Sequence, residues 1–346
     1  MLLYVIVLLI LFVSSYLEVL IKRKDQGLQK LFSYIYIIPI FLLFAFNRDN
    51  NDYQTYQILF EYKMDDFGYE VLKKIVKSFN GNHNWIIFTT ASLSFYILIN
   101  KKNIFYRITL LFLYYISNLL YDINIIRNTL MITFVYISLR FLENKKNILS
   151  IIFVILASTF HKVGIIYFIF YLLYFILRKK YFSITKKLLI MIILVTPFFV
   201  LSLETFQMIL MKYIGEKANY FEIVKLGAVT NVVQVFFDVL LMTIYKNELK
   251  KDGEIDVNFK FFFFTLLFLP FCFINKEFYN RLYRNSLFAK WYYFLNKMKM
   301  RNLKVKIITY LILVVNAGLS ILTIYIRNPI FVEDLMNNLL KFSFSF

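Results

Sequence analysis

The chain has 346 residues, of which 60% are hydrophobic and 20% aromatic, and its formal net charge is +19. One soluble core of this length does not hide so much apolar surface, which excludes an ordinary soluble domain and favours a membrane protein whose side chains face lipid. In such a protein the positive charge indicates basic loops beside anionic headgroups, and no nucleic-acid partner is expected. The single cysteine, Cys272, excludes disulfides within the chain and cysteine-based metal sites.

Apolar runs of about 15–20 residues cross a hydrocarbon core of about 30 Å. Their number here predicts an all-α integral membrane protein, a single polytopic domain over residues 1–346 with about twelve transmembrane helices. The predicted spans are Leu2–Leu20, Leu31–Phe46, Trp85–Ile99, Ile108–Leu120, Leu130–Leu142, Ile148–Phe160, Gly164–Leu177, Leu188–Leu203, Ala228–Tyr245, Phe261–Ile274, Leu287–Leu295 and Ile307–Ile326. The weakest is Leu287–Leu295, because Lys290 lies inside it.

The connections between these spans differ in basic residues. One alternate set holds 24 of the 40 Lys and Arg residues and the other set holds 15. By the positive-inside rule the richer set is cytoplasmic, which places both termini on the external side. The largest cytoplasmic loop, residues 246–260, has no glycine-rich phosphate cradle, so ATP is not expected as an energy source within this chain.

The largest external loop, residues 47–84, combines apolar residues at helical spacing with lysines between them. These are Leu72, Ile75, Val76 and Phe79, with Lys73, Lys74 and Lys77. The pattern predicts an amphipathic helix lying in the membrane interface. A loop that only rests on the membrane does not explain Arg48 and Asp52, which stand where the chain leaves the bilayer. His83 and Trp85 close the loop and are expected at the interface, with Trp85 as an anchor.

Further polar residues stand on the same external side. They are Arg127 with Asn128, His161 with Lys162, Tyr220, and Arg281 with Arg284. One arginine at a span boundary is most often a snorkelling anchor, and a lone histidine at a helix end is more often structural than catalytic. Several arginines on the less basic face favour a phosphorylated ligand at headgroup level, because guanidinium grips phosphate oxygens bidentately. Two histidines without nearby carboxylates do not favour a zinc site, and no metal or other cofactor is expected.

A series of short motifs resembles those of the EpsG family of polysaccharide-biosynthesis membrane proteins. The motifs are Arg48…Asp52-Tyr53, Tyr56, Phe60 and Gly68-Tyr69 in the first external loop, then Ile126-Arg127-Asn128, Phe160-His161-Lys162 and Arg281-Leu282. The resemblance covers most of the chain in order and spacing. The chain departs from the family pattern at Asn50-Asn51, where glycine is common, at Asp66, where glutamate is frequent, and at Asn128, where glutamine is usual.

The resemblance implies a Wzy-type polymerase of O-antigen, capsule or exopolysaccharide repeat units in the bacterial cytoplasmic membrane. Donor and acceptor would both be oligosaccharides on undecaprenyl diphosphate. A separate flippase would deliver them to the outer leaflet, and a chain-length regulator is a further expected partner. The donor is already activated, which agrees with the lack of an ATP site.

The same interpretation gives the candidate residues their roles. Arg127, Arg281 and Arg48 would neutralise the departing diphosphate, because guanidinium stays protonated. Asp52 is favoured as the base or acceptor-orienting group, and His161 as a contact to phosphate or sugar. The remaining candidates for substrate binding are Tyr53, Tyr56, Asn128, Lys162, Tyr220 and Arg284.

Two other functions remain open. A polysaccharide O-acyltransferase needs a histidine-centred site that an internal acyl donor reaches, whereas both histidines are expected outside. A lipid-linked oligosaccharide flippase or transporter needs charges along a path through mid-span positions, whereas the charges here collect at one rim.

Overall fold

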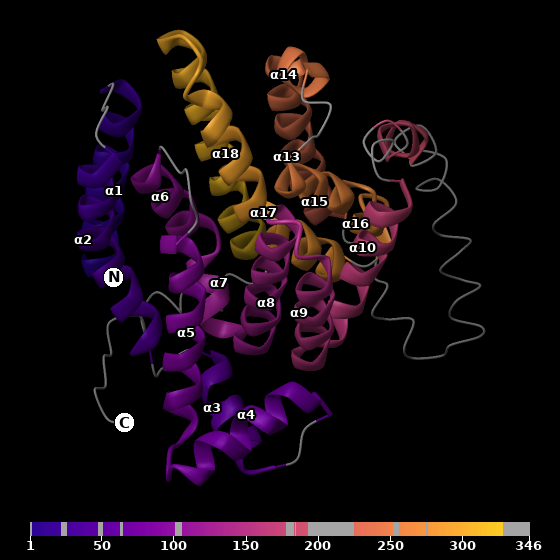
Figure 1. Ribbon diagram of the computed structural model, residues 1–346. Coiled ribbons are helices and arrows are strands. Elements are labelled where there is room, and N and C mark those ends of the chain that lie inside the picture. Colours follow the sequence, from indigo (N-terminus) through magenta and orange to yellow (C-terminus); the bar gives the residue numbers. More distant parts are fainter. Residues whose placement is uncertain are drawn as a thin grey trace. The chain divides into compact units, whose positions relative to one another are not determined.

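The computed structural model describes residues 2–21, 26–47, 51–62, 65–100, 106–177, 183, 185–192, 225–251, 256–274 and 276–327 (Figure 1). Its labelled elements are helices, one of them the short 3-10 helix η1. They are α1 (Leu2–Leu20), α2 (Gln26–Ala45), α3 (Asn51–Glu61), α4 (Phe67–Ser78), α5 (His83–Asn100), α6 (Arg107–Ser117), α7 (Leu119–Asn124), α8 (Ile126–Glu143), α9 (Asn147–Phe160), η1 (Lys162–Gly164), α10 (Ile165–Leu177), α13 (Lys225–Ile244), α14 (Lys246–Lys251), α15 (Val257–Leu266), α16 (Phe271–Ile274), α17 (Lys276–Met298) and α18 (Leu303–Arg327).

Most predicted spans coincide with one helix to within a few residues. Two are interrupted: Ile108–Leu120 by the turn between α6 and α7, and Phe261–Ile274 by the turns between α15 and α16. Most of Leu188–Leu203 lies outside the described residues. Among the described residues, only the segment Leu303–Leu322 of α18 is long and apolar enough, by length and composition, to cross a membrane. Seven other helices contain shorter apolar segments of 10–17 residues. The number of twelve spans therefore stays a prediction.

The chain divides into two compact units, residues 1–171 with 294–346, and residues 172–293. In the first unit α8 packs on α9, α2 on α5, and α1 on α6 and α18. The first backbone N–H groups of α6 find a hydrogen-bond acceptor on α1. The Glu18 carboxylate accepts from the N–H groups of Ile108 and Thr109 at 3.2 and 2.8 Å. Ser15 and Tyr310 join α1 to α18 through their hydroxyls, which lie 2.8 Å apart.

The second unit contains a buried polar triad of Asp238, Tyr283 and Lys290. The Lys290 ammonium donates to Asp238 Oδ1 and to the Tyr283 hydroxyl, both at 3.0 Å, and that hydroxyl donates to Asp238 Oδ2 at 2.6 Å. The side chains of Asp238 and Lys290 are both 0% exposed. The lysine that weakens the predicted span Leu287–Leu295 is thus neutralised by a carboxylate of α13, and α17 runs unbroken through it.

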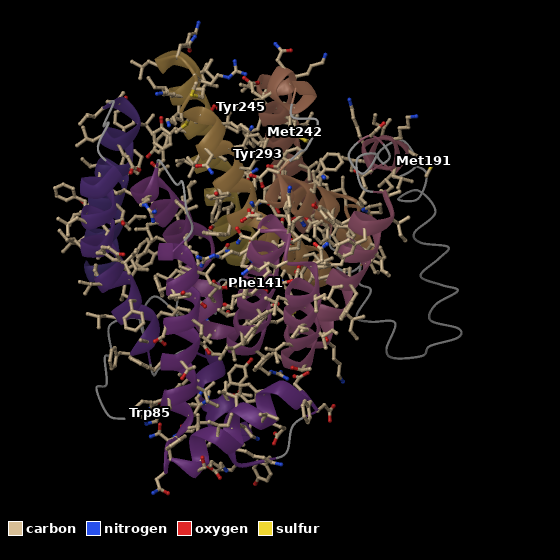
Figure 2. All side chains as sticks on the ribbon, in the orientation of Figure 1. Trp85, Phe141, Met191, Met242, Tyr245 and Tyr293 are labelled. Atoms are coloured by element: carbon tan, nitrogen blue, oxygen red, sulfur yellow. The ribbon has the colours of Figure 1, made fainter. Side chains whose placement is uncertain are left out.

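In the first unit α3 and α4 lie across one end of α5, as Figure 1 shows. Trp85, labelled in Figure 2, lies at that same end and is 44% exposed, as an interfacial anchor requires. The predicted amphipathic helix is α4, and its face towards the unit carries Tyr69, Lys73 and Val76. Ile75 and Phe79 are 50% and 82% exposed, so part of its apolar surface points away from the unit.

One of the three lysines of this helix, Lys73, lies on its buried face. Lys73 is 4% exposed, and its ammonium donates to the backbone oxygens of Leu59 at 3.0 Å and of Tyr62. It also pairs with Glu70 at 2.6 Å. The last carbonyls of α3 have no partner within their own helix, and a buried cation that satisfies them joins α4 to α3.

Candidate functional site

Arg127 stands at the second position of α8, directly after the bend that separates α7 from α8. Its Nη1 group donates to Asp66 Oδ2 in an ion pair. The arginine side chain is 27% exposed and the aspartate side chain 6%. Asp66 precedes α4 at the N-cap position but makes no side-chain cap there, since its carboxylate is used on Arg127. The pair therefore fixes the start of α4 to the start of α8.

Tyr56 contacts both Arg127 and His83. Its ring centre is 5.7 Å from the guanidinium carbon of Arg127, and the ring stacks on the imidazole of His83 at 5.8 Å and 14°. Tyr69 completes the group, with its hydroxyl 3.5 Å from His83 Nδ1. We call Tyr56, Asp66, Tyr69, His83 and Arg127 the Arg127 cluster. Four helices contribute to it, α3, α4, α5 and α8, with Asp66 at the start of α4.

Burial and charge act together on the Arg127 cluster. Burial disfavours the charged guanidinium, but Tyr56 and Asp66 outweigh that effect and raise the pKa of Arg127 above its ordinary value. Burial also raises the pKa of Tyr69, whose hydroxyl therefore stays neutral. The Nε–H of Arg127 is buried and has no hydrogen-bond partner among the described residues. The cluster thus holds a permanent cation with one unsatisfied donor.

His161 and Lys162 follow α9 in the same unit. The Nδ1 atom of His161 accepts the backbone N–H of Val163 at 3.2 Å and caps η1, so a neutral ring carries its proton on Nε2. The Lys162 ammonium lies 3.5 Å from the Asp65 carboxylate, and both side chains are strongly exposed. Asp65 and Asp66 are consecutive, so one short stretch before α4 contacts both η1 and α8.

Gly68 explains how α4 comes so close to α9. A Cβ atom at this position would lie 2.3 Å from Thr159 Oγ1 and 3.1 Å from the Thr159 carbonyl carbon. The first contact is far inside van der Waals range, so the approach requires a residue without a side chain. This packing sets the position of Asp65 and Asp66 opposite Lys162 and Arg127.

The second unit carries the other two candidate arginines, both on α17. Arg284 is 6% exposed and Arg281 is half-buried. Arg284 stands a little under two helical turns before Lys290 of the buried triad, and Arg281 about two and a half turns before it. Within the described residues, no three side chains of His, Cys, Asp and Glu gather as a metal site would need.

A family model described as EpsG family matches residues 30–344, nearly the whole chain. The chain belongs to the EpsG family. No curated protein and no solved structure matches it significantly. Membership of the EpsG family, together with the helical and apolar character of the chain, indicates a membrane protein with a polymerase-type role in polysaccharide biosynthesis.

The structure of this EpsG-family protein brings some of the candidate residues together. Tyr56 contacts Arg127, and Tyr53 lies nearby, since its hydroxyl donates to Asn84 Oδ1 at 2.7 Å. Asn128 follows Arg127 and is 1% exposed. Arg48 and Tyr220 lie outside the described residues, and for Asp52 only the backbone, in α3, is described. The roles of all these residues stay predictions.

Sequence reasoning missed three members of the Arg127 cluster as site residues, Asp66, Tyr69 and His83. The expected position of His83 at the membrane interface stays a prediction; within the protein its side chain is 3% exposed and surrounded by aromatic rings. The helical spacing of Tyr69 and Val76 is visible in the sequence and could have marked the buried face of α4. Nothing in the sequence alone indicates that Asp66 pairs with Arg127, which is 61 positions away.

Proposed function

We propose that this EpsG-family protein is a Wzy-like polysaccharide polymerase. It transfers the growing chain from one undecaprenyl diphosphate to an oligosaccharide repeat unit on a second, at the outer face of the bacterial cytoplasmic membrane. Family membership supports the polymerase class. The observation that carries the proposal is Arg127, an oriented and half-buried cation whose Nε–H has no partner within the described residues.

The geometry of Arg127 suits a diphosphate. Asp66 holds Nη1 and the Tyr56 ring faces the guanidinium, so its orientation is fixed before any ligand arrives. The Arg127 side chain is 27% exposed, so a phosphate oxygen can approach the part of it that Asp66 does not cover. Hydrogen bonds between guanidinium and phosphate are charge-assisted and roughly twice as strong as neutral ones.

The reaction is a displacement at the anomeric carbon of the donor sugar. A hydroxyl of the acceptor repeat unit forms the new glycosidic C–O bond, and the bond from the anomeric carbon to the diphosphate oxygen breaks. The diphosphate leaves with the electron pair, and the hydroxyl proton passes to a base. Arg127 stabilises the charge that develops on the leaving diphosphate, which is the step that a preorganised cation favours most.

Asp52 and His161 divide the remaining chemistry. We assign the base to Asp52, a carboxylate in the external loop that leads to Tyr56. When neutral, His161 uses Nδ1 to accept from Val163, so its Nε2–H is a donor. A donor suits contact with a sugar or phosphate oxygen better than proton removal. Arg48 and Arg281 stay candidates for neutralising the diphosphate, and Arg284 for binding the substrate.

The test is Arg127→Ala in a strain that lacks the chromosomal gene. Loss of one such charge contact typically costs about 3 kcal/mol of barrier, roughly a hundredfold in rate, so long polymer disappears while the protein is still present. Arg140→Ala, at the opposite end of α8, is the matched control and keeps normal polymer. Normal long-chain polymer from the Arg127→Ala strain refutes the proposal.

The same strains separate the polymerase from a flippase. A strain without polymerase activity still exposes single repeat units at its surface, whereas a strain without flippase activity retains them inside. Labelling surface glycans of the deletion strain with an impermeant reagent distinguishes the two. Retention of the units inside the cell assigns the chain to transport.

A further inference from the structure

A groove lies between α3 and α4, with a volume of about 710 Å³. Lys73 shapes it, because this lysine ties α4 to the last carbonyls of α3. Pockets that bind small ligands occupy roughly 300–1,000 Å³, so the groove has room for a short oligosaccharide. Its lining residues are Phe60, Glu61, Tyr62, Asp65, Phe67, Glu70, Val71, Lys73, Lys74 and Lys77.

The described lining of the groove is electrically balanced. It contains three lysines and three carboxylates, so the formal charge of these described residues is zero. Two of the lysines are paired within the groove, Lys73 with Glu70 at 2.6 Å and Lys77 with Glu61 at 2.7 Å. A site for phosphate or for anionic headgroups carries an excess of positive charge, and the described residues of this groove do not.

Aromatic rings provide the rest of the lining. Tyr62 and Phe67 are 66% and 70% exposed, and the Lys77 ammonium lies 4.8 Å from the centre of the Phe60 ring. Exposed rings beside paired charges offer apolar faces together with hydrogen-bond donors and acceptors. A neutral sugar presents the same combination, with C–H faces and hydroxyls. A polyprenyl tail does not, because it has no group for the six charged side chains of the lining.

The groove adjoins the Arg127 cluster along the chain. Asp65 lines the groove, and the next residue, Asp66, forms the ion pair with Arg127. Consecutive Cα atoms are about 3.8 Å apart, so the lining of the groove and the ion pair of Arg127 meet at neighbouring backbone positions. A glycan attached to a lipid diphosphate needs a sugar site next to a phosphate site, and the groove and Arg127 are neighbours of this kind along the chain.

We propose that the groove between α3 and α4 binds the neutral oligosaccharide part of the growing chain while its diphosphate is at Arg127. The assignment rests on the proposed polymerase function and adds a binding site for the sugar chain to it. A chain held in the groove remains on the protein between successive transfers. Occupancy of the groove therefore raises the length of the polymer.

The test measures binding to the full chain in lipid nanodiscs with two probes. One is lipid-free polysaccharide, released by mild acid from the host's own surface polymer and labelled at its end. The other is undecaprenyl diphosphate without sugar. Tyr62→Ala and Phe67→Ala remove exposed groove rings, and Phe79→Ala is the matched control, because Phe79 is 82% exposed and does not line the groove.

Each groove variant is expected to bind the polysaccharide about tenfold more weakly, the effect of losing one stacked ring, and to bind undecaprenyl diphosphate as the wild type does. In cells the same variants make shorter polymer, and Phe79→Ala makes polymer of normal length. Wild-type affinity for the polysaccharide in both groove variants overturns the proposal.

A second contrary outcome is an equal loss of polysaccharide binding in the Tyr62, Phe67 and Phe79 variants, which assigns the effect to exposed aromatic surface in general and not to the groove. The proposed function fails on a different measurement, normal polymerisation by Arg127→Ala. The two failures are therefore distinguishable.

Discussion

In the proposed reaction Asp66 contacts no substrate and acts only through its ion pair with Arg127, and replacing it by alanine tests that role. The substitution leaves the guanidinium in place with the Tyr56 ring still facing it, but removes the carboxylate that holds Nη1. Arg127 remains charged, so the variant still attracts the diphosphate. It loses the fixed orientation that stabilises the leaving group, which makes Asp66 a positioning residue.

The size of the effect follows from the burial of the two partners. Unit charges about 4 Å apart attract by about 4 kcal/mol at an effective dielectric constant of 20. Asp66 is 6% exposed, but Arg127 is 27% exposed, and water recovers part of that attraction when the carboxylate is lost. A hydrogen bond to a charged group is worth about 1.5–3 kcal/mol net, and about 2 kcal/mol corresponds to roughly thirtyfold in rate.

The assay follows single transfers by the purified chain on a lipid-linked repeat unit, with kcat and KM determined separately. For Asp66→Ala we expect kcat to fall about thirtyfold with little change in KM, because ground-state attraction persists while transition-state orientation is lost. Glu143→Ala, at the far end of α8, controls for a general loss of charge on the first unit. Asp66→Glu should recover part of kcat.

Wild-type kcat in Asp66→Ala refutes the reasoning, and so does a rise in KM at constant kcat. The first result would mean that Arg127 needs no partner to act. The second would mean that the pair contributes to binding alone.

Two further predictions concern packing. Asp238→Ala leaves Lys290 buried without its carboxylate and should destabilise the chain by about 3–5 kcal/mol. The double variant Asp238→Leu with Lys290→Met should recover most of that loss. Thermal unfolding in detergent measures both variants, and a double variant as unstable as Asp238→Ala contradicts this explanation. Gly68→Ala forces α4 away from Thr159 and should cost about 1–3 kcal/mol. Gly318→Ala in α18 is its control, since a Cβ there meets nothing within 4 Å, and equal stability of the two variants would contradict the close approach.

The positions of helices could be predicted well because they depend on local pattern. Apolar runs predicted the locations of α1, α9 and α18 closely. Breaks such as the turn at Asn118 were not predicted, because the apolar residues continue through them. The weak prediction at Lys290 has a related cause, since its partner Asp238 is 52 positions away and a window along the sequence does not contain both.

The candidate site could be predicted only in part, for a similar reason. Arg127 was identified because an arginine at a span boundary of the less basic face needs an explanation. Its partner Asp66 was noted only as a departure from the family pattern, and nothing in the sequence indicated its ion pair with Arg127. The burial of Lys73 could not be predicted, because it depends on backbone oxygens at and after the end of α3 that accept from its ammonium.

Every residue that lines the groove comes from one contiguous stretch, Phe60 to Lys77. The lining residues and Lys73, which joins α4 to α3, therefore belong to one continuous segment of the sequence. Under the proposed sugar binding, substitutions within this segment would change the glycan preference without altering the packing of the long helices. Exchanging residues 60–77 between family members is then expected to transfer glycan preference, while Arg127 stays with the recipient.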